Sequence, residues 1–445
     1  MMNGIKKSIY YTLGFSTTTP LLALVLGGHS ISLMYIAYLF AFGDLLFARG
    51  KRFVRIKSNN SLFKLFGCYL VICFVASLFG IFFFWVEQKS YALAQVSFLP
   101  KILLYLFFLI LLDANRYGSE KACLILDGIK YGAIINIIWS IADAFIFYTI
   151  GISITNEFFI SVIEAMDLPN TQASIIEGLF IRSSGLTIDQ CFIGYYAIAL
   201  TIYSLVKKRR LLMLLSVIAC FASVSIIGLV GIIMVLIVYV IKQKNIVQNI
   251  ALVSILILFF AVIYHFSDNE MVTNFKTAVE LRLESKADND ASASTRKLFI
   301  EEFPGALMNM PTALFLGTGY FSASYAYFPQ GLEYAKYDKF HMYPVPIENM
   351  YIETLFAVGL SGLIVFVLFY LRIIKYAGRL LRFKKDEEFA VILYTFTIGA
   401  MILFMFYHNV FDSTIMLLSI CAASSLKKST YNNTALELNT QKLRI

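Results

Sequence analysis

The chain has 445 residues, of which 59% are hydrophobic and only 15% charged, and its formal net charge is +9. A soluble domain does not bury that much apolar surface, so these fractions exclude an ordinary soluble protein. The apolar residues form long uniform blocks, which suit membrane-spanning helices and not the alternating strands of a barrel. We therefore predict an all-α, polytopic membrane protein.

About twelve apolar segments are predicted to cross the bilayer, which takes roughly 20 residues per helix. The first follows Lys6 and Lys7 as in a signal peptide, but another apolar block begins at Ile31, so we interpret it as an uncleaved span. Residues 211–241 are short for two crossings, and one long helix is the alternative; Ser225 and Gly228 favour a turn. The predicted spans are residues 9–27, 31–48, 62–86, 97–113, 124–152, 188–206, 211–226, 228–241, 247–267, 347–373, 388–408 and 412–426.

Lysines and arginines gather in alternate connections, at residues 49–57, 116–121, 207–210, 242–244, 372–385 and 427–428. By the positive-inside rule these connections and both termini are cytoplasmic. The positive charge then reflects topology and contact with anionic membrane lipid, and no nucleic acid is expected as a partner.

Two predicted outer connections are long, residues 153–187 and residues 268–346. We predict a membrane domain of nine spans over residues 1–267 and a large extracytoplasmic loop over 268–346. Three further spans are predicted over 347–426, followed by a cytoplasmic tail over 427–445. A loop as long as 268–346 in a compact membrane protein is usually functional.

Candidate chemistry gathers at the predicted outer face. Glu348 leads into a span, where a carboxylate facing a wet cleft would act as a general base; placement at the positive end of a helix dipole explains it equally well. Arg182 and Arg296 offer planar forks that suit phosphate, although either is also an ordinary surface residue. The loop tyrosines would stack on sugars or anchor at the interface. The weak pattern at Asp288 and Asp290 is typical of a solvated loop, so no metal or other cofactor is expected.

Three stretches, in order, resemble the O-antigen polymerase and O-antigen ligase superfamily of bacterial envelope glycan assembly. They are Arg182–Gly185 with Asp189, Arg296–Gly319 ending in Leu-Gly-Thr-Gly, and Glu348–Gly362. The resemblance implies a helical GT-C-like fold in the inner membrane. It also implies glycan transfer from an undecaprenyl diphosphate carrier at the outer face, without metal.

Carried onto this sequence, the resemblance makes Arg182 and Arg296 ligands of the diphosphate leaving group and places Glu348 and Asn349 beside the acceptor hydroxyl. Family ligases typically have His then Asn here, with a glycine eleven positions after the His. Glu348 replaces that His while Gly359 keeps the spacing, which favours a polymerase. Many members also carry Ser-Arg between the seventh and eighth spans, where this chain has Ser225 and Ile226. Further substrate contacts are expected from Asp189, Lys297, Tyr320, His341 and Tyr351.

The predicted function is therefore an inverting glycosyltransferase that joins undecaprenyl-diphosphate-linked oligosaccharide repeat units into O-antigen or capsular polysaccharide. A ligase that transfers glycan to lipid A core is the nearest alternative. A polysaccharide flippase or other transporter is a second alternative, although we find no internal repeat of the kind that transporters show. A flippase and a chain-length regulator are candidate partner proteins.

Overall fold

The computed structural model describes most of the predicted membrane domain and little of the large loop. The described residues are 4–26, 29–47, 61–84, 89–115, 117–165, 174–176, 180–187, 191–223, 225–241, 304–305, 308, 313–320, 349–383, 387–405, 407 and 412–425. The chain divides into two compact units. Unit 1 comprises Met1–Thr17, Ala37–Ile129 and Ser292–Ile445, and unit 2 comprises Thr18–Ile36 and Lys130–Ala291.

Helices dominate the described residues, as predicted. Unit 1 holds α1 (Gly4–Thr18), most of α2 (Leu33–Phe47), α3 (Ser61–Phe84), α4 (Lys89–Ala114), α13 (Ala313–Leu316), α16 (Met350–Phe383), α17 (Glu388–Leu403) and a last helix, Ser413–Ser425. Helix α5 (Gly118–Ile150) begins in unit 1 and continues in unit 2. Unit 2 adds β1 (Ala23–Leu26), β2 (His29–Ser32), α6 (Ile154–Ala165), β3 (Ser174–Ile176), β4 (Phe180–Arg182), α7 (Cys191–Lys207), α8 (Arg210–Ala222) and α9 (Ile226–Ile241).

The helices are those of a polytopic membrane protein. Within the described residues, four are long and apolar enough to cross a bilayer, over Ser61–Phe82, Gln95–Ala114, Gly118–Ile150 and Met350–Arg382, and six shorter apolar helices accompany them. On α3 the exposed side chains Val71, Val75, Phe79 and Phe82 recur every three or four residues, so they form one apolar stripe that suits lipid. Ten of the twelve predicted spans coincide with these helices; of the other two, 9–27 overlaps α1 only in part, and 247–267 lies outside the described residues.

Two details of the predicted spans are decided by the structure. Residues 211–241 form two helices, α8 and α9, as predicted, and the Ser225 hydroxyl accepts a hydrogen bond from Gly228 N at 3.2 Å at the start of α9. The prediction of a helix over 9–27 was wrong in its last part. Helix α1 ends at Thr18 because Pro20 disfavours helical backbone in the residue before it, and Ala23–Leu26 pairs with His29–Ser32 as an antiparallel hairpin.

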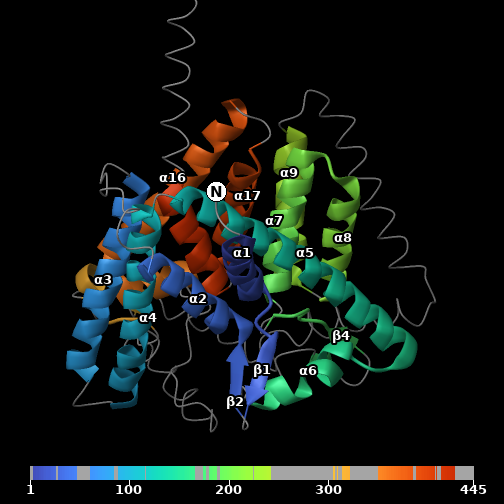
Figure 1. The fold of residues 1–445 in the computed structure, drawn as a ribbon, viewed down its shortest axis with the longest axis horizontal. Coiled ribbons are helices and arrows are strands. Elements are labelled where there is room, and N and C mark those ends of the chain that lie inside the picture. The colour runs from blue at the N-terminus through green and yellow to red at the C-terminus, as the bar shows by residue number, and fades with distance from the viewer. Residues whose placement is uncertain are drawn as a thin grey trace, which may run out of the picture. The chain divides into compact units, whose positions relative to one another are not determined.

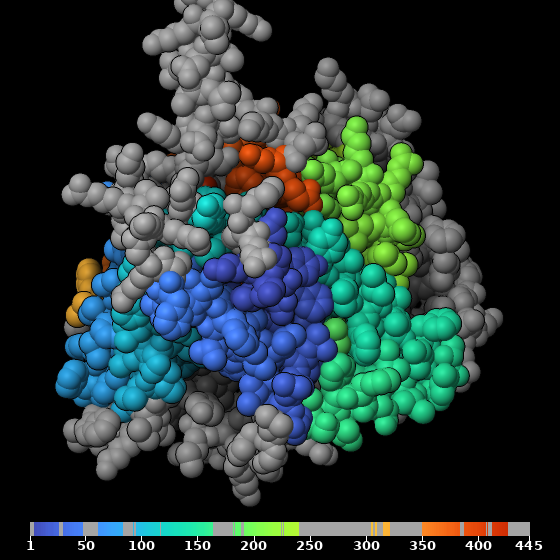
Figure 2. Space-filling view, viewed as in Figure 1, coloured from blue at the N-terminus to red at the C-terminus, as the bar shows by residue number. Residues whose placement is uncertain are grey.

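In unit 1, α3 packs between α4 and α16, and α16 also packs against α17 (Figure 1). Aromatic rings fill the α3–α16 contact: the Phe66 and Phe369 rings stack with centroids 4.8 Å apart, and those of Tyr69 and Phe366 lie 5.4 Å apart. The space-filling view shows α3 and α4, in blue and cyan, as one closely packed surface (Figure 2). Helix α16 is thereby held by helices on two sides.

A charge cluster joins helix ends that the sequence predicts on the cytoplasmic side. Asp44, near the end of α2, pairs with Lys6 at 2.6 Å and with Lys121 of α5 at 2.7 Å, and Tyr10 donates to the same carboxylate at 2.9 Å. The Lys121 side chain is almost fully buried, so its charge requires this partner. The beginnings of α1 and α5 and the end of α2 thus meet, as alternating topology requires.

In unit 2, α7 is the central helix. It packs against both α8 and α9, and Phe192–Ser204 is buried throughout. Figure 1 shows the three helices side by side. The predicted outer connection 153–187 contains α6 and the β3–β4 hairpin, in which Ser174 pairs with Arg182.

Candidate functional site

Helix α16 is broken at Gly359, where φ is 71° and ψ is 177°. The break leaves carbonyl groups of the preceding turn without helical partners. The Phe356 carbonyl accepts a hydrogen bond from Thr318 N at 3.1 Å, and the Ala357 carbonyl accepts one from Gly319 N at 2.8 Å. The segment Leu316–Gly319 is therefore attached to α16 by its own backbone at the point where the helix is interrupted.

Glycine is required on both sides of this junction. Essentially only glycine adopts the backbone conformation of Gly359, and a Cβ there would lie 2.5 Å from the Phe315 carbonyl oxygen. Gly317, with φ of 68°, approaches the backbone of Ala357 and Val358 just as closely. The Leu-Gly-Thr-Gly stretch and the Glu348–Gly362 stretch, which the sequence places in order only, are thus in direct contact.

The start of α16 is tied to the end of α17. The Asn349 side-chain oxygen accepts hydrogen bonds from Tyr351 N at 3.1 Å and Ile352 N at 3.2 Å, which caps the helix, and its amide nitrogen donates to the Met405 carbonyl at 3.2 Å. Met350 N donates to the Phe404 carbonyl at 2.8 Å. Asn349 therefore fixes the N-terminus of α16 against the end of α17. Glu348 immediately precedes it and lies outside the described residues.

The two described tyrosines among the predicted substrate contacts are both held by protein partners. Tyr320 is 1% exposed, and its hydroxyl is hydrogen-bonded to the hydroxyls of Tyr69 and, at 3.1 Å, Thr354. Tyr351 is half-buried and donates to the Met401 carbonyl at 3.0 Å. Both tyrosines thus help to fix α16, and their contact with substrate stays a prediction.

Sequence reasoning did not select a buried polar layer beside the α16 break. Gln95 of α4 is fully buried and donates through Nε2 to the Tyr320 carbonyl, and Glu353 of α16 is 1% exposed. Buried polar groups within a membrane segment are costly and mark functional regions. The signals were present, since Gln95 begins the apolar part of α4 and Glu353 lies one turn after Asn349. Within the described ranges, no three histidine, cysteine, aspartate or glutamate side chains form a metal-binding group.

The remaining predicted site residues have partial or no structural description. Arg182 ends β4, where its backbone pairs with Ser174 in β3, and nothing is described of its side chain. The predictions for Arg296, Glu348, Lys297, Asp189 and His341 fall outside the described residues. Their assigned roles therefore stay predictions.

Residues 210–367 match a family model described as O-antigen ligase. The match extends from the start of α8 through the first half of α16, so it contains the Arg296–Gly319 stretch, Glu348 and the Gly359 break, and it does not contain Arg182 or Asp189. No curated protein matches the chain. The resemblance to the O-antigen polymerase and ligase superfamily is confirmed by this domain, and the enzymes of that family are glycosyltransferase-like.

Proposed function

We propose that the protein is a polysaccharide polymerase of the bacterial inner membrane, with about twelve spans and a GT-C-like helical fold. It joins oligosaccharide repeat units carried on undecaprenyl diphosphate, at the outer face, into O-antigen or capsular polysaccharide. The observation that carries the proposal is the α16 break. It attaches the Leu316–Gly319 segment to the same helix that follows Glu348 and Asn349 in the sequence.

The proposed reaction is an inverting displacement without metal. The oxygen of a sugar hydroxyl on one lipid-linked repeat forms a bond to the anomeric carbon of the growing chain, and the bond from that carbon to the diphosphate breaks. Glu348 accepts the hydroxyl proton. Arg182 and Arg296 offset the charge that develops on the departing undecaprenyl diphosphate, where fixed positive groups stabilise the transition state most.

Asn349 supports the role of Glu348 by fixing the backbone that follows it. The Asn349 side chain caps α16 and binds the end of α17, so the residue that follows Glu348 in the sequence is held in place. A general base must lie within hydrogen-bond reach of the proton that it takes, so a fixed attachment point is a requirement of the mechanism. Asn349 lies beside the acceptor hydroxyl in this scheme.

A ligase that transfers glycan to lipid A core is the second candidate, because the matched family model is described as O-antigen ligase. Glu348, in place of the His typical of the ligases, favours the polymerase. The two activities leave different products. Without a polymerase, single repeats still reach the surface, whereas without a ligase no repeat does.

The test is a gel profile of surface glycan from a strain lacking the gene, complemented with the wild type, Glu348→Gln or the matched control Glu387→Gln, which lies just before α17. We expect the wild type and the control to restore a ladder, and Glu348→Gln to leave a single-repeat band at equal protein level in the membrane. Loss of all surface glycan in the deletion strain supports the ligase. An unchanged ladder in that strain excludes both candidates.

A further inference from the structure

Asp143 on α5 is a fully buried carboxylate that accepts four hydrogen bonds. Its Oδ1 accepts from Ser153 Oγ at 3.0 Å and from Thr155 N at 3.2 Å. Its Oδ2 accepts from Thr155 Oγ1 at 2.9 Å and from Ser183 Oγ at 2.7 Å. A carboxylate buried in an apolar protein is costly unless its lone pairs are satisfied, and these donors satisfy them.

The four donors come from both ends of the connection 153–187. Ser153 and Thr155 lie at the start of α6, and Ser183 follows Arg182 directly. The Ser183 hydroxyl also accepts from Gly185 N at 3.3 Å, and the Thr155 hydroxyl accepts from Trp139 Nε1 of α5 at 2.9 Å. The Asp143 carboxylate therefore joins the two ends of the connection 153–187, which contains Arg182.

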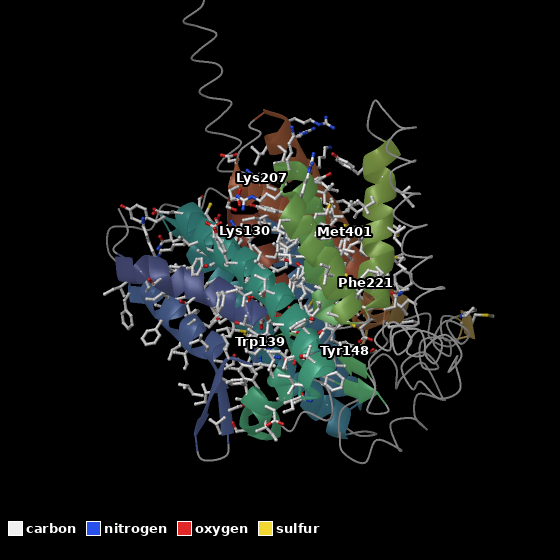
Figure 3. All side chains as sticks on the ribbon, turned by 90° about the vertical axis from the view of Figure 1, so that its right-hand side faces the viewer. Lys130, Trp139, Tyr148, Lys207, Phe221 and Met401 are labelled. Carbon is white, nitrogen blue, oxygen red and sulfur yellow. The ribbon has the colours of Figure 1, made fainter. Side chains whose placement is uncertain are left out.

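Further contacts from α5 fix the same turn. Asn136, about two helical turns before Asp143, accepts from Leu186 N at 2.7 Å and donates to the Thr18 carbonyl at 2.6 Å. Ile181, on the other side of Arg182, packs with Ala144 and Phe147 of α5, and Tyr148 packs against this cluster. Figure 3 labels Trp139 and Tyr148 on α5, before and after Asp143 along the helix.

We propose that Asp143 is a positioning residue for Arg182 in glycan transfer. This inference rests on the proposed function, in which Arg182 binds the diphosphate. The hydrogen bond to Ser183 fixes the residue next to Arg182, and the packing of Ile181 fixes the residue before it. Contacts with α5 thus fix the residues on both sides of Arg182. Displacement of a charge-stabilising group by about 1 Å costs on the order of 100-fold in rate, so this anchoring matters for the reaction.

The chemistry of the contact predicts that an amide cannot replace the carboxylate. In Asp143→Asn, one acceptor oxygen becomes an NH₂ donor. Where the NH₂ group faces Ser183 and Thr155, the O–H groups of these residues lose the acceptor that they now use. Their hydroxyl oxygens already accept from Gly185 N and Trp139 Nε1. A nearly isosteric change therefore disturbs the turn after Arg182 while it keeps the volume of the side chain.

The experiment measures coupling of lipid-linked repeat units, extracted from the producing strain, by the purified full-length protein in detergent. We would compare the wild type, Asp143→Asn, Arg182→Ala and the double variant, with undecaprenyl diphosphate as a competitive inhibitor. Asp127→Asn is the matched control, about four turns earlier on α5. We expect kcat/KM to fall by about 100-fold in Arg182→Ala and by at least about 10-fold in Asp143→Asn, with weaker inhibition in both. The double variant should be no more than about 3-fold below Arg182→Ala.

The outcomes separate positioning from plain stabilisation. Additive losses in the double variant, or inhibition unchanged by Asp143→Asn, overturn the positioning role. If Asp143→Asn does not accumulate in the membrane, Ser183→Ala removes the bond to Asp143 next to Arg182 together with the bond from Gly185 N. Ser153→Ala removes a matching pair, to Asp143 and from Asn156 N, at the other end of the connection. The inference requires a larger loss in kcat/KM for Ser183→Ala, and equal losses refute it. A wild-type protein that couples no repeats removes the proposed function itself, and the inference with it.

Discussion

At the scale of single residues, the polar side chains that the structure describes hold the backbone of the candidate site. Asn349 caps α16 and binds α17, and the Tyr320 hydroxyl joins α3 to α16 through Tyr69 and Thr354. Such bonds are directional, so each one fixes the position of the segment that it binds. Glu348, the predicted general base, is next to Asn349 in the sequence.

Tyr320 offers a direct test of an anchoring role. Tyr320→Phe removes one hydroxyl from a fully buried pair of contacts and leaves the Tyr69 and Thr354 hydroxyls each short of a partner. We expect a loss of about 1–3 kcal/mol in the free energy of unfolding, measured by thermal unfolding in detergent. The matched control Tyr35→Phe changes a side chain that is 59% exposed, and it should shift stability by less than about 0.5 kcal/mol. Equal stability of both variants would show that the Tyr320 hydroxyl has no anchoring role.

The candidate site could be predicted from the sequence only as residue types and order. The Glu348-Asn349 pair and the glycine eleven positions later were visible, and the structure shows that this glycine breaks α16. What the sequence did not show is the partner of the break, because the hydrogen bonds from Thr318 and Gly319 are non-local and carry no periodic signal. The hydrogen bonds of Asp143 could not be predicted either, because its donors lie 10 to 40 residues away in the sequence.

At the scale of elements, the helices could be predicted from the length of the apolar segments. Their ends could be predicted only where turn-forming residues were recognised. The turn between α8 and α9 was predicted from Ser225 and Gly228, which do hydrogen-bond to each other there. The end of α1 was missed, because Ala23–Leu26 is as apolar as a span and only Pro20 shows that the helix has ended. Apolar content alone does not separate a short strand from the last turn of a helix.

The α16 break predicts different effects of the same substitution at two glycines of one helix. Gly359→Ala places a Cβ against the Phe315 carbonyl in a backbone conformation that alanine avoids, at a cost on the order of 3 kcal/mol. Gly378→Ala meets only the Tyr394 ring at 3.4 Å, and alanine favours a helix interior by up to about 1 kcal/mol. We expect the first variant to lose the surface-glycan ladder and the second to keep it at equal or greater protein level. A ladder of normal length in Gly359→Ala would show that the break is dispensable.

At the scale of the whole molecule, helix ends that the positive charges predict on the same side of the membrane are in contact within unit 1. Lys6, Asp44 and Lys121 meet at ends predicted on the cytoplasmic side. The start of α16 meets the end of α17 where both are predicted to face outward. Alternation of the ends is expected when each of these helices crosses once.

The predicted topology has its most demanding test at residues 247–267, the one span outside the described residues. Alkaline phosphatase, which is active only outside the cytoplasm, should be inactive when fused after Lys244 and active when fused after Ala287. Fusions after Arg209 and Asn170 form the matched pair, inactive and active respectively, across a segment that the structure describes as α7. If the first pair does not differ while the second does, residues 247–267 do not cross. Glu348 would then lie on the cytoplasmic side, where a lipid-linked chain at the outer face is out of reach, and the proposed polymerase would be excluded together with the ninth span.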